Sequence, residues 1–245
     1  MTPENKYQGI FLIAALLVLA CGIGYASTNI YKGLREFKSY DRFVTVKGLA
    51  QKDVVADLVL WPISYTETGN DLSALQATMD TRGANVITFL KKYGVADSEI
   101  ELQQVNVQDL MAQGYRQDNI QESRYILTQT YMVRTPNVES VYKASQNVGE
   151  LVKQGIVLAQ GGTGPTYLYT KLNDIKPEMI AQATQNAREA ADQFAKDSGQ
   201  KVGDIRTAYQ GIFQILARDD TYAVSEPQQM NKTVRVVSTI DFYLK

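Results

Sequence analysis

A continuous apolar run near the N-terminus constrains this chain more than any other feature. The run extends from Ile10 to Thr28, and no charged residue falls between Lys6 and Lys32. At a rise of about 1.5 Å per residue it would form roughly 28 Å of helix, which matches the hydrocarbon core of a bilayer. We therefore predict one transmembrane helix over residues 10–30.

The flanks of this run favour a retained anchor over a cleavable signal peptide. A signal peptide needs a positively charged n-region and an apolar h-region of about 7 to 15 residues. Here the tail at residues 1–9 contains one basic residue, Lys6, and one acidic residue, Glu4, and the apolar run is longer than an h-region requires. Cleavage remains the alternative. Amphipathic tyrosine rings prefer the membrane interface, and the residues expected to contact the bilayer are Tyr7, Phe11, Leu12, Leu16, Leu17, Leu19, Ile23 and Tyr31.

The residue content excludes several classes of site. The chain has no histidine, and Cys21, its single cysteine, lies inside the apolar run. Ser-His-Asp and Cys-His arrangements and the usual zinc ligand sets are therefore absent. The net charge is -1 with both signs mixed along the chain, which does not predict a basic face for nucleic acid. We expect no catalytic residue, no cofactor, no metal site and no nucleic-acid partner.

The soluble part begins with strand-like segments. A charged linker at residues 31–42 precedes a domain over residues 43–245. FVTVKGLA, which starts at Phe43, and DVVADLVLWPISYT, which starts at Asp53, alternate apolar and polar residues, as strands do. We predict that they form an antiparallel pair with a turn near Gln51 and Lys52.

Pro62 limits where the second of these strands can lie in a sheet. It cannot donate a hydrogen bond to a β ladder, so we expect this strand at a sheet edge, or bulged around Trp61 and Pro62.

Further along, apolar residues recurring every three or four positions predict helices that end at Gly94, Gly155 and Gly199. Alternating segments predict further strands at residues 100–109, 122–134, 166–172, 204–216 and 233–244.

One order of elements occurs twice in the domain. The order is a helix, a glycine, an isoleucine, a strand, a polar loop and a second strand. It occurs first around Gly94 and Ile100 and again around Gly199 and Ile205. The repeat predicts an α+β fold in which helices cover antiparallel sheets. The two related subdomains would be residues 43–135 and 136–245.

Three segments resemble a known family. They are FVTVKGLA with KDVVADLVL, AREAADQFAKDSGQKVGDI at residues 187–205, and TVRVVSTIDFYLK at the end of the sequence. Together they resemble the SIMPL-domain family of mostly bacterial cell-envelope proteins, over residues 43–245. The resemblance implies self-association outside the cytoplasmic membrane and a link to envelope and oxidative-stress defence. It brings no catalytic motif.

The orientation in the membrane is open to two interpretations. Lys32, Arg35 and Lys38 after the apolar run outnumber Lys6 before it, and the positive-inside rule would then keep the domain in the cytoplasm. The family resemblance implies the opposite side. We place the domain on the periplasmic side of a bacterial inner membrane, with the cytoplasmic side as the alternative.

These observations predict a membrane-anchored, non-enzymatic envelope protein that assembles with itself into a ring or cage. Tethered copies meet at high effective concentration, so weak contacts suffice to hold them together. The alternative is a binding or chaperone-like module that presents the loops at residues 110–121 and 217–232 to an unknown envelope protein. The candidate assembly or partner contacts are Trp61, Pro62, Tyr115, Arg116, Tyr222 and Pro227.

Overall fold

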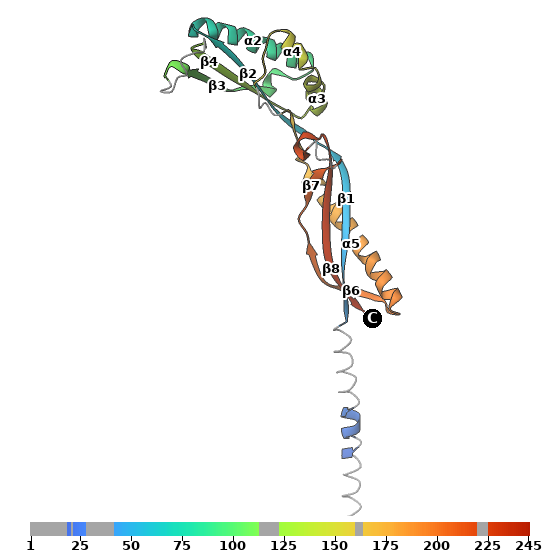
Figure 1. The fold of residues 1–245 in the computed structure, drawn as a ribbon. Coiled ribbons are helices and arrows are strands. Elements are labelled where there is room, and N and C mark those ends of the chain that lie inside the picture. The colour runs from blue at the N-terminus through green and yellow to red at the C-terminus, as the bar shows by residue number, and fades with distance from the viewer. Residues whose placement is uncertain (1–18, 21, 28–41, 113–122, 160–163, 220–224) are drawn as a thin grey trace, which may run out of the picture. The chain divides into compact units, whose positions relative to one another are not determined.

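The computed structural model describes residues 19–20, 22–27, 42–112, 123–159, 164–219 and 225–245 (Figure 1). It shows the predicted combination of two antiparallel sheets with helices. The chain divides into two compact units, each built from segments that are far apart in the sequence. Unit 1 comprises Met1–Ala50, Glu178–Ile212 and Val236–Lys245, and unit 2 comprises Gln51–Pro177 and Phe213–Arg235.

The predicted membrane anchor falls largely outside the described residues. Leu19 and Ile23 belong to described helical positions, and each is 62% exposed. In the part of the chain that the structure describes, no helix is both long and apolar enough to cross a bilayer. The other predicted bilayer contacts lie outside the described residues, namely Tyr7, Phe11, Leu12, Leu16, Leu17 and Tyr31.

Unit 2 contains a four-stranded antiparallel sheet in the order β3-β4-β2-β5. Helices contact this sheet on one face, where the odd-numbered residues of β2 and β4 are mostly buried. Burial of these apolar side chains against the helices is the main favourable term in the stability of the unit. The strands are β2 (Leu58–Gly69), β3 (Ile100–Asp109), β4 (Tyr125–Thr135) and β5 (Thr166–Leu168), and the helices are α2 (Leu72–Lys92), α3 (Val138–Gln146) and α4 (Gly149–Lys153).

Local signals place the ends of these helices. The Asp71 carboxylate accepts hydrogen bonds from the backbone N–H groups of Ser73 and Ala74 at 2.8 and 3.0 Å and so caps α2. Gly94, at φ 92°, ends the same helix as predicted. The single helix expected up to Gly155 is instead two helices, α3 and α4. The break lies at Asn147, whose side-chain amide donates to the Lys143 carbonyl at 2.9 Å, a local bond that competes with helix continuation.

The predicted pairing of the first two strands is wrong. Strand β1 (Phe43–Val55) runs through the expected turn and belongs to the other sheet, whose order is β1-β8-β6 with β7 beside β8. The chain leaves that sheet at Asp57, whose carboxylate accepts hydrogen bonds from the N–H and hydroxyl groups of Thr170 at 2.6 and 2.9 Å. The remaining strands are β6 (Val202–Gln210), β7 (Gln214–Ala217) and β8 (Asn231–Leu244).

Strand β2 is an inner strand, so the expected edge position is also wrong. The register with β4 is continuous through Pro62, which lies opposite Met132, and shows no bulge. Pairing with β5 ends at Leu60, and the next backbone hydrogen bonds on that side are made at Ser64 and Thr66. Pro62 lies in the gap between these contacts. The backbone N–H group that proline lacks is therefore not needed for any hydrogen bond of the sheet.

In unit 1 the long helix α5 (Leu172–Asp197) packs on the sheet through small residues. From Glu178 onward its buried stripe includes Ala183, Ala187 and Ala191. The sheet meets it at Gly48 of β1, where a Cβ atom would lie 1.8 Å from the Ala183 carbonyl oxygen. Only a residue without a side chain fits this contact.

Another glycine explains why the strand expected at residues 204–216 is divided into β6 and β7. The N–H of Gly211 donates to the Val237 carbonyl at 2.9 Å. A Cβ atom at Gly211 would lie 2.3 Å from that oxygen. The backbone approaches its neighbour too closely here for any other residue, and strand geometry stops at this point.

Both sheets show the same arrangement of elements. In each, the strand after a long helix lies at an edge, β3 after α2 and β6 after α5. The next long strand, β4 or β8, lies inside beside the edge strand. The subdomain ranges 43–135 and 136–245 stay a prediction.

A tyrosine cluster lies between the sheet of unit 2 and α2. The hydroxyl of Tyr65 donates to the Met79 carbonyl at 3.2 Å, and its ring stacks with that of Tyr131 at 6.4 Å between centroids. Gly83 of α2 makes room for both hydroxyls, since a Cβ there would lie 2.6 Å from the Tyr131 oxygen. Burial raises the pKa of both tyrosines, and the nearby Asp80 carboxylate adds to the effect.

The contact at Gly48 gives a first prediction. Gly48→Ala pushes β1 and α5 apart and lowers the free energy of unfolding by about 2 kcal/mol or more, as overpacking does. Gly149→Ala is the matched control, because a Cβ at Gly149 meets nothing within 4 Å. Urea unfolding followed by circular dichroism measures both variants. Equal stability of the two variants would show that this contact is not tight.

The tyrosine cluster gives a second prediction, on pH. The pKa values of Tyr65 and Tyr131 are higher in the folded chain than the ordinary tyrosine value of 10.0. Their contribution to stability is therefore complete below pH 10 and is lost as the pH rises through the folded pKa values. The variant Tyr65→Phe/Tyr131→Phe should lose stability less steeply above pH 10 than the wild type. Urea unfolding between pH 8 and 11 tests this, and parallel curves would refute it.

Candidate functional site

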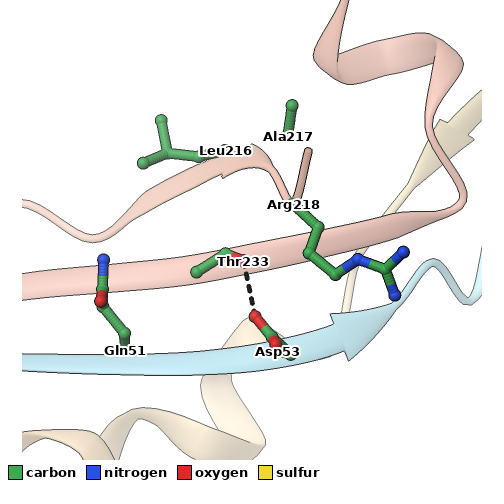
Figure 2. A pocket seen from close by; sticks show the side chains of 6 residues that line it. All are labelled: Gln51, Asp53, Leu216, Ala217, Arg218 and Thr233. Atoms are coloured by element: carbon green, nitrogen blue, oxygen red, sulfur yellow. Dashed lines mark hydrogen bonds between the residues drawn. The ribbon is translucent and has the colours of Figure 1, made fainter. Parts of the chain in front are cut away.

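An open hollow of about 440 Å³ lies on the surface of unit 2. Strand β1 contributes Gln51 and Asp53, and the residues at the end of β7 and the start of β8 contribute the rest (Figure 2). Thr233 of β8 donates a hydrogen bond to Asp53 at 2.6 Å across the hollow. The complete lining is Gln51, Asp53, Leu216, Ala217, Arg218 and Thr233.

The charged groups of this hollow already have partners. The Arg218 guanidinium pairs with Asp219 at 2.9 Å, and this hydrogen bond raises the pKa of Arg218. The Asp53 carboxylate accepts a hydrogen bond from the Thr233 hydroxyl. The hollow therefore offers hydrogen-bond contacts to a small polar group. Across the described ranges, no group of three or more His, Cys, Asp or Glu is placed to hold a metal ion.

The edge strand β3 of unit 2 is exposed over most of its length. It pairs with β4 on one side and forms the end of the sheet on the other. Between Glu101 and Asp109 it carries no charged residue and no proline. Charges and prolines are the devices that commonly prevent an edge strand from pairing with another chain. This edge lacks them over seven consecutive residues, Leu102–Gln108.

Apolar side chains of β3 are exposed on the helix-bearing face of the sheet. Val105 and Val107 lie opposite Gln129 and Leu127 of β4, on the face that α2 covers over β2 and β4. They are nevertheless 45% and 49% exposed. Leu102, at 50%, lies opposite Tyr131 on the same face, and Met111, at 55%, follows the strand in a short 3₁₀ helix, η2 (Leu110–Ala112). We call Leu102, Val105, Val107 and Met111 the β3 apolar strip.

A buried acceptor adjoins this strip. Gln129 is only 4% exposed, and its amide nitrogen donates to the Tyr131 hydroxyl at 3.1 Å. Its carbonyl oxygen is buried and has no hydrogen-bond partner within the described part of the chain. An unpaired buried acceptor costs about 1–3 kcal/mol.

The base of the loop after β3 is held firmly. Arg124 donates to both carboxylate oxygens of Asp109, with the shortest contact at 3.0 Å, and its guanidinium also lies over the Tyr125 ring. The backbone N–H of Arg124 donates to Asn70 at 2.8 Å. The hydrogen bonds from Arg124 hold the pKa of Asp109 below its usual value. These bonds fix the end of β3 and so keep its free edge in place.

One edge strand of the other sheet, β6, is protected in the usual ways. It carries Asp204 and Arg206 and shows two register shifts against β8. Charges and irregular pairing both disfavour the addition of a further strand. Strand β3 has one register shift, between Leu102 and Gln104, but no charged residue from Leu102 to Gln108, and it is therefore better suited to pairing than β6.

The predicted contact residues do not converge in the structure. Trp61 is 5% exposed inside the core of unit 2, and Pro62 of β2 is partly exposed. Pro227 is exposed in a short 3₁₀ helix, η3 (Glu226–Gln228). There the buried Lys232 ammonium donates to the Glu226 carbonyl at 2.8 Å and pairs with the Glu226 carboxylate. Tyr115, Arg116 and Tyr222 lie outside the described residues.

Sequence reasoning missed the β3 apolar strip. The strand at residues 100–109 was predicted with the observed bounds, but its apolar residues have the same alternation as core positions. One signal was available, since residues 102–108 hold four polar amides and no charge. That composition is unusual for an edge strand facing water.

Comparisons with known proteins give a family but no activity. Two solved structures from Listeria innocua show a similarity of 10% identity and a TM-score of 0.21 each. One is described as a hydrolase and covers 86% of this chain and 97% of its own; the other, an uncharacterized conserved protein, covers 76% and 91%. TM-scores this low support no argument about fold or function. No match was found among curated proteins.

A family profile matches most of the soluble part. The match extends over residues 44–242 and carries the description "SIMPL: Protein of unknown function (DUF541)". It agrees with the segments that resembled this family in the sequence alone. The chain therefore belongs to the SIMPL (DUF541) family.

Proposed function

We propose that this chain is a membrane-anchored, non-enzymatic protein of the bacterial envelope that assembles with copies of itself. The free edge of β3 supplies one contact of the assembly. The observation that carries this proposal is the uncharged edge of β3 together with the half-exposed β3 apolar strip. Ring or cage formation, and a role in envelope or oxidative-stress defence, belong to the same proposal.

Strand pairing at this edge would form backbone hydrogen bonds and would also bury apolar side chains. A second strand laid against β3 pairs N–H and C=O groups that otherwise bond only to water. Valines at positions 105 and 107 then pack against side chains of the added strand, and such cross-strand pairs contribute about 0.2–1 kcal/mol each. Individually these gains are small, and several together make a weak but specific contact.

The anchor makes a weak contact sufficient. Copies held in one membrane meet at a high effective concentration, so each additional contact forms as if within one molecule. Pairing of two identical β3 edges is isologous and produces a dimer. A ring or cage therefore requires a second, different contact between dimers, and a lone β3 contact would stop at two subunits.

Lysines on the β3 edge test the proposal. Full-length wild-type protein in detergent should show at least twice the 27.3 kDa mass of one chain by light scattering. The variant Val105→Lys/Val107→Lys places two charges on the edge and should weaken association by at least about tenfold, because edge lysines block strand addition. A wild type that stays monomeric at micromolar concentration would refute self-assembly.

A matched control separates this effect from a general loss of apolar surface. Tyr142 of α3 and Val152 of α4 are exposed to a comparable extent, at 45% and 58%, in the same unit. Tyr142→Lys/Val152→Lys should leave the assembly unchanged. If both double variants dissociate equally, or neither does, the β3 edge is not the contact. If the wild type is monomeric but pairs with a different envelope protein through β3, the alternative binding function replaces self-assembly.

A further inference from the structure

One end of unit 1 gathers basic residues from three strands. The N–H of Leu244 donates to the Arg42 carbonyl at 2.9 Å, and Lys201 and Lys245 exchange two backbone hydrogen bonds at 2.8 and 2.9 Å. Figure 1 shows this end, where the C-terminus lies beside β6 and the first residues of β1. The side chains of Arg42, Lys201 and Lys245 are all exposed there. The hydrogen bonds hold these charges together.

Apolar side chains accompany the charges at this end. The Arg206 guanidinium lies 4.1 Å from the ring centroid of Phe43. Phe43 and Ile205 are 42% and 43% exposed, although both are residue types that usually lie in a core. A surface that combines basic groups with exposed aromatic and aliphatic side chains is typical of proteins that lie against a lipid interface.

The acidic groups nearby leave an excess of positive charge. Asp204 pairs with Lys245 at 3.4 Å, but both side chains are well exposed, at 89% and 66%. Asp241 accepts a hydrogen bond from Thr45 at 2.7 Å. An exposed pair of this length contributes little and breaks easily in favour of other partners. Asp197, the last residue of α5, adds a third carboxylate four residues before Lys201. The four basic residues Arg42, Lys201, Arg206 and Lys245 thus exceed these three carboxylates by one.

The sequence keeps this end close to the membrane. Residues 31–42 join the predicted anchor to β1. A linker of this length spans at most about 40 Å when fully extended. Before Arg42 it contains three basic residues, Lys32, Arg35 and Lys38, and two acidic residues, Glu36 and Asp41, a net charge of +1. The N-terminal end of β1, and the basic groups beside it, therefore remain within reach of lipid headgroups.

We propose that this basic end of unit 1, formed by Arg42, Phe43, Lys201, Ile205, Arg206 and Lys245, docks on anionic phospholipid headgroups of the membrane that holds the anchor. The inference rests on the anchor of the proposed function. Lysine and arginine contact the headgroup phosphates, and each basic residue near an anionic surface favours binding by about fivefold. Phe43 and Ile205 enter the interfacial layer, where their apolar surface leaves water.

Hydrogen exchange on the full-length protein in nanodiscs tests this docking. One set of discs contains about 30% phosphatidylglycerol in phosphatidylcholine, a strongly anionic surface, and the other phosphatidylcholine alone. In the anionic discs, exchange at residues 199–206 and 242–245 should slow by at least about fivefold relative to the neutral discs. The difference should disappear in about 0.5 M salt, which screens exposed charges.

Charge reversal identifies the residues responsible. Lys201→Glu/Arg206→Glu should abolish the protection in anionic discs. Arg134→Glu/Lys153→Glu, which changes the charge equally at exposed positions of unit 2, should not affect it. Equal exchange in the two kinds of disc, or protection that survives Lys201→Glu/Arg206→Glu, would overturn the docking. Failure of the anchor gives a different result, because the wild type would then not enter discs of either composition. Failure of self-assembly would change only the mass of the particles and not the exchange at this end of unit 1.

Discussion

The one-sided hydrogen bonding of β3 is the constraint on which the proposed function depends. Three strands of the sheet in unit 2 lie under or beside helices, whereas β3 has a free edge and half-exposed apolar side chains. The ion pair of Arg124 with Asp109 holds the end of this strand in a defined position. A fixed, uncharged edge is a better template for strand addition than a frayed one, because less conformational entropy is lost on pairing.

Small residues determine how closely helices approach the sheets. Gly48 lets β1 meet the alanine stripe of α5, and Gly83 lets two tyrosine hydroxyls reach α2. Each contact would be lost with a single added methyl group. Gly48 and its neighbour Ala187 fall on segments that resemble the family, whereas Gly83 lies outside them. Close packing explains why small residues stand at Gly48 and Ala187.

Local signals in the sequence predicted elements well and pairing poorly. The glycine at position 94 and the alternation at residues 100–109 each act within a few residues, and the structure confirms the helix end and the strand that they predict. The hairpin of the first two strands was wrong because the partners of β1 are distant in sequence. Asp53 bonds to Thr233, 180 residues away. The β3 apolar strip was missed for a related reason. The exposure of these side chains depends on how far α2 extends over the sheet, which the local alternation of apolar and polar residues does not show.

Electron cryomicroscopy of the intact protein in nanodiscs examines the assembly most directly. The β3 edge of each subunit should be covered by a strand from a second copy, with Val105 and Val107 packed against side chains of that strand. Particles in which every β3 edge faces solvent, whether the protein is a monomer or assembles through other surfaces, would contradict the role assigned to this strand.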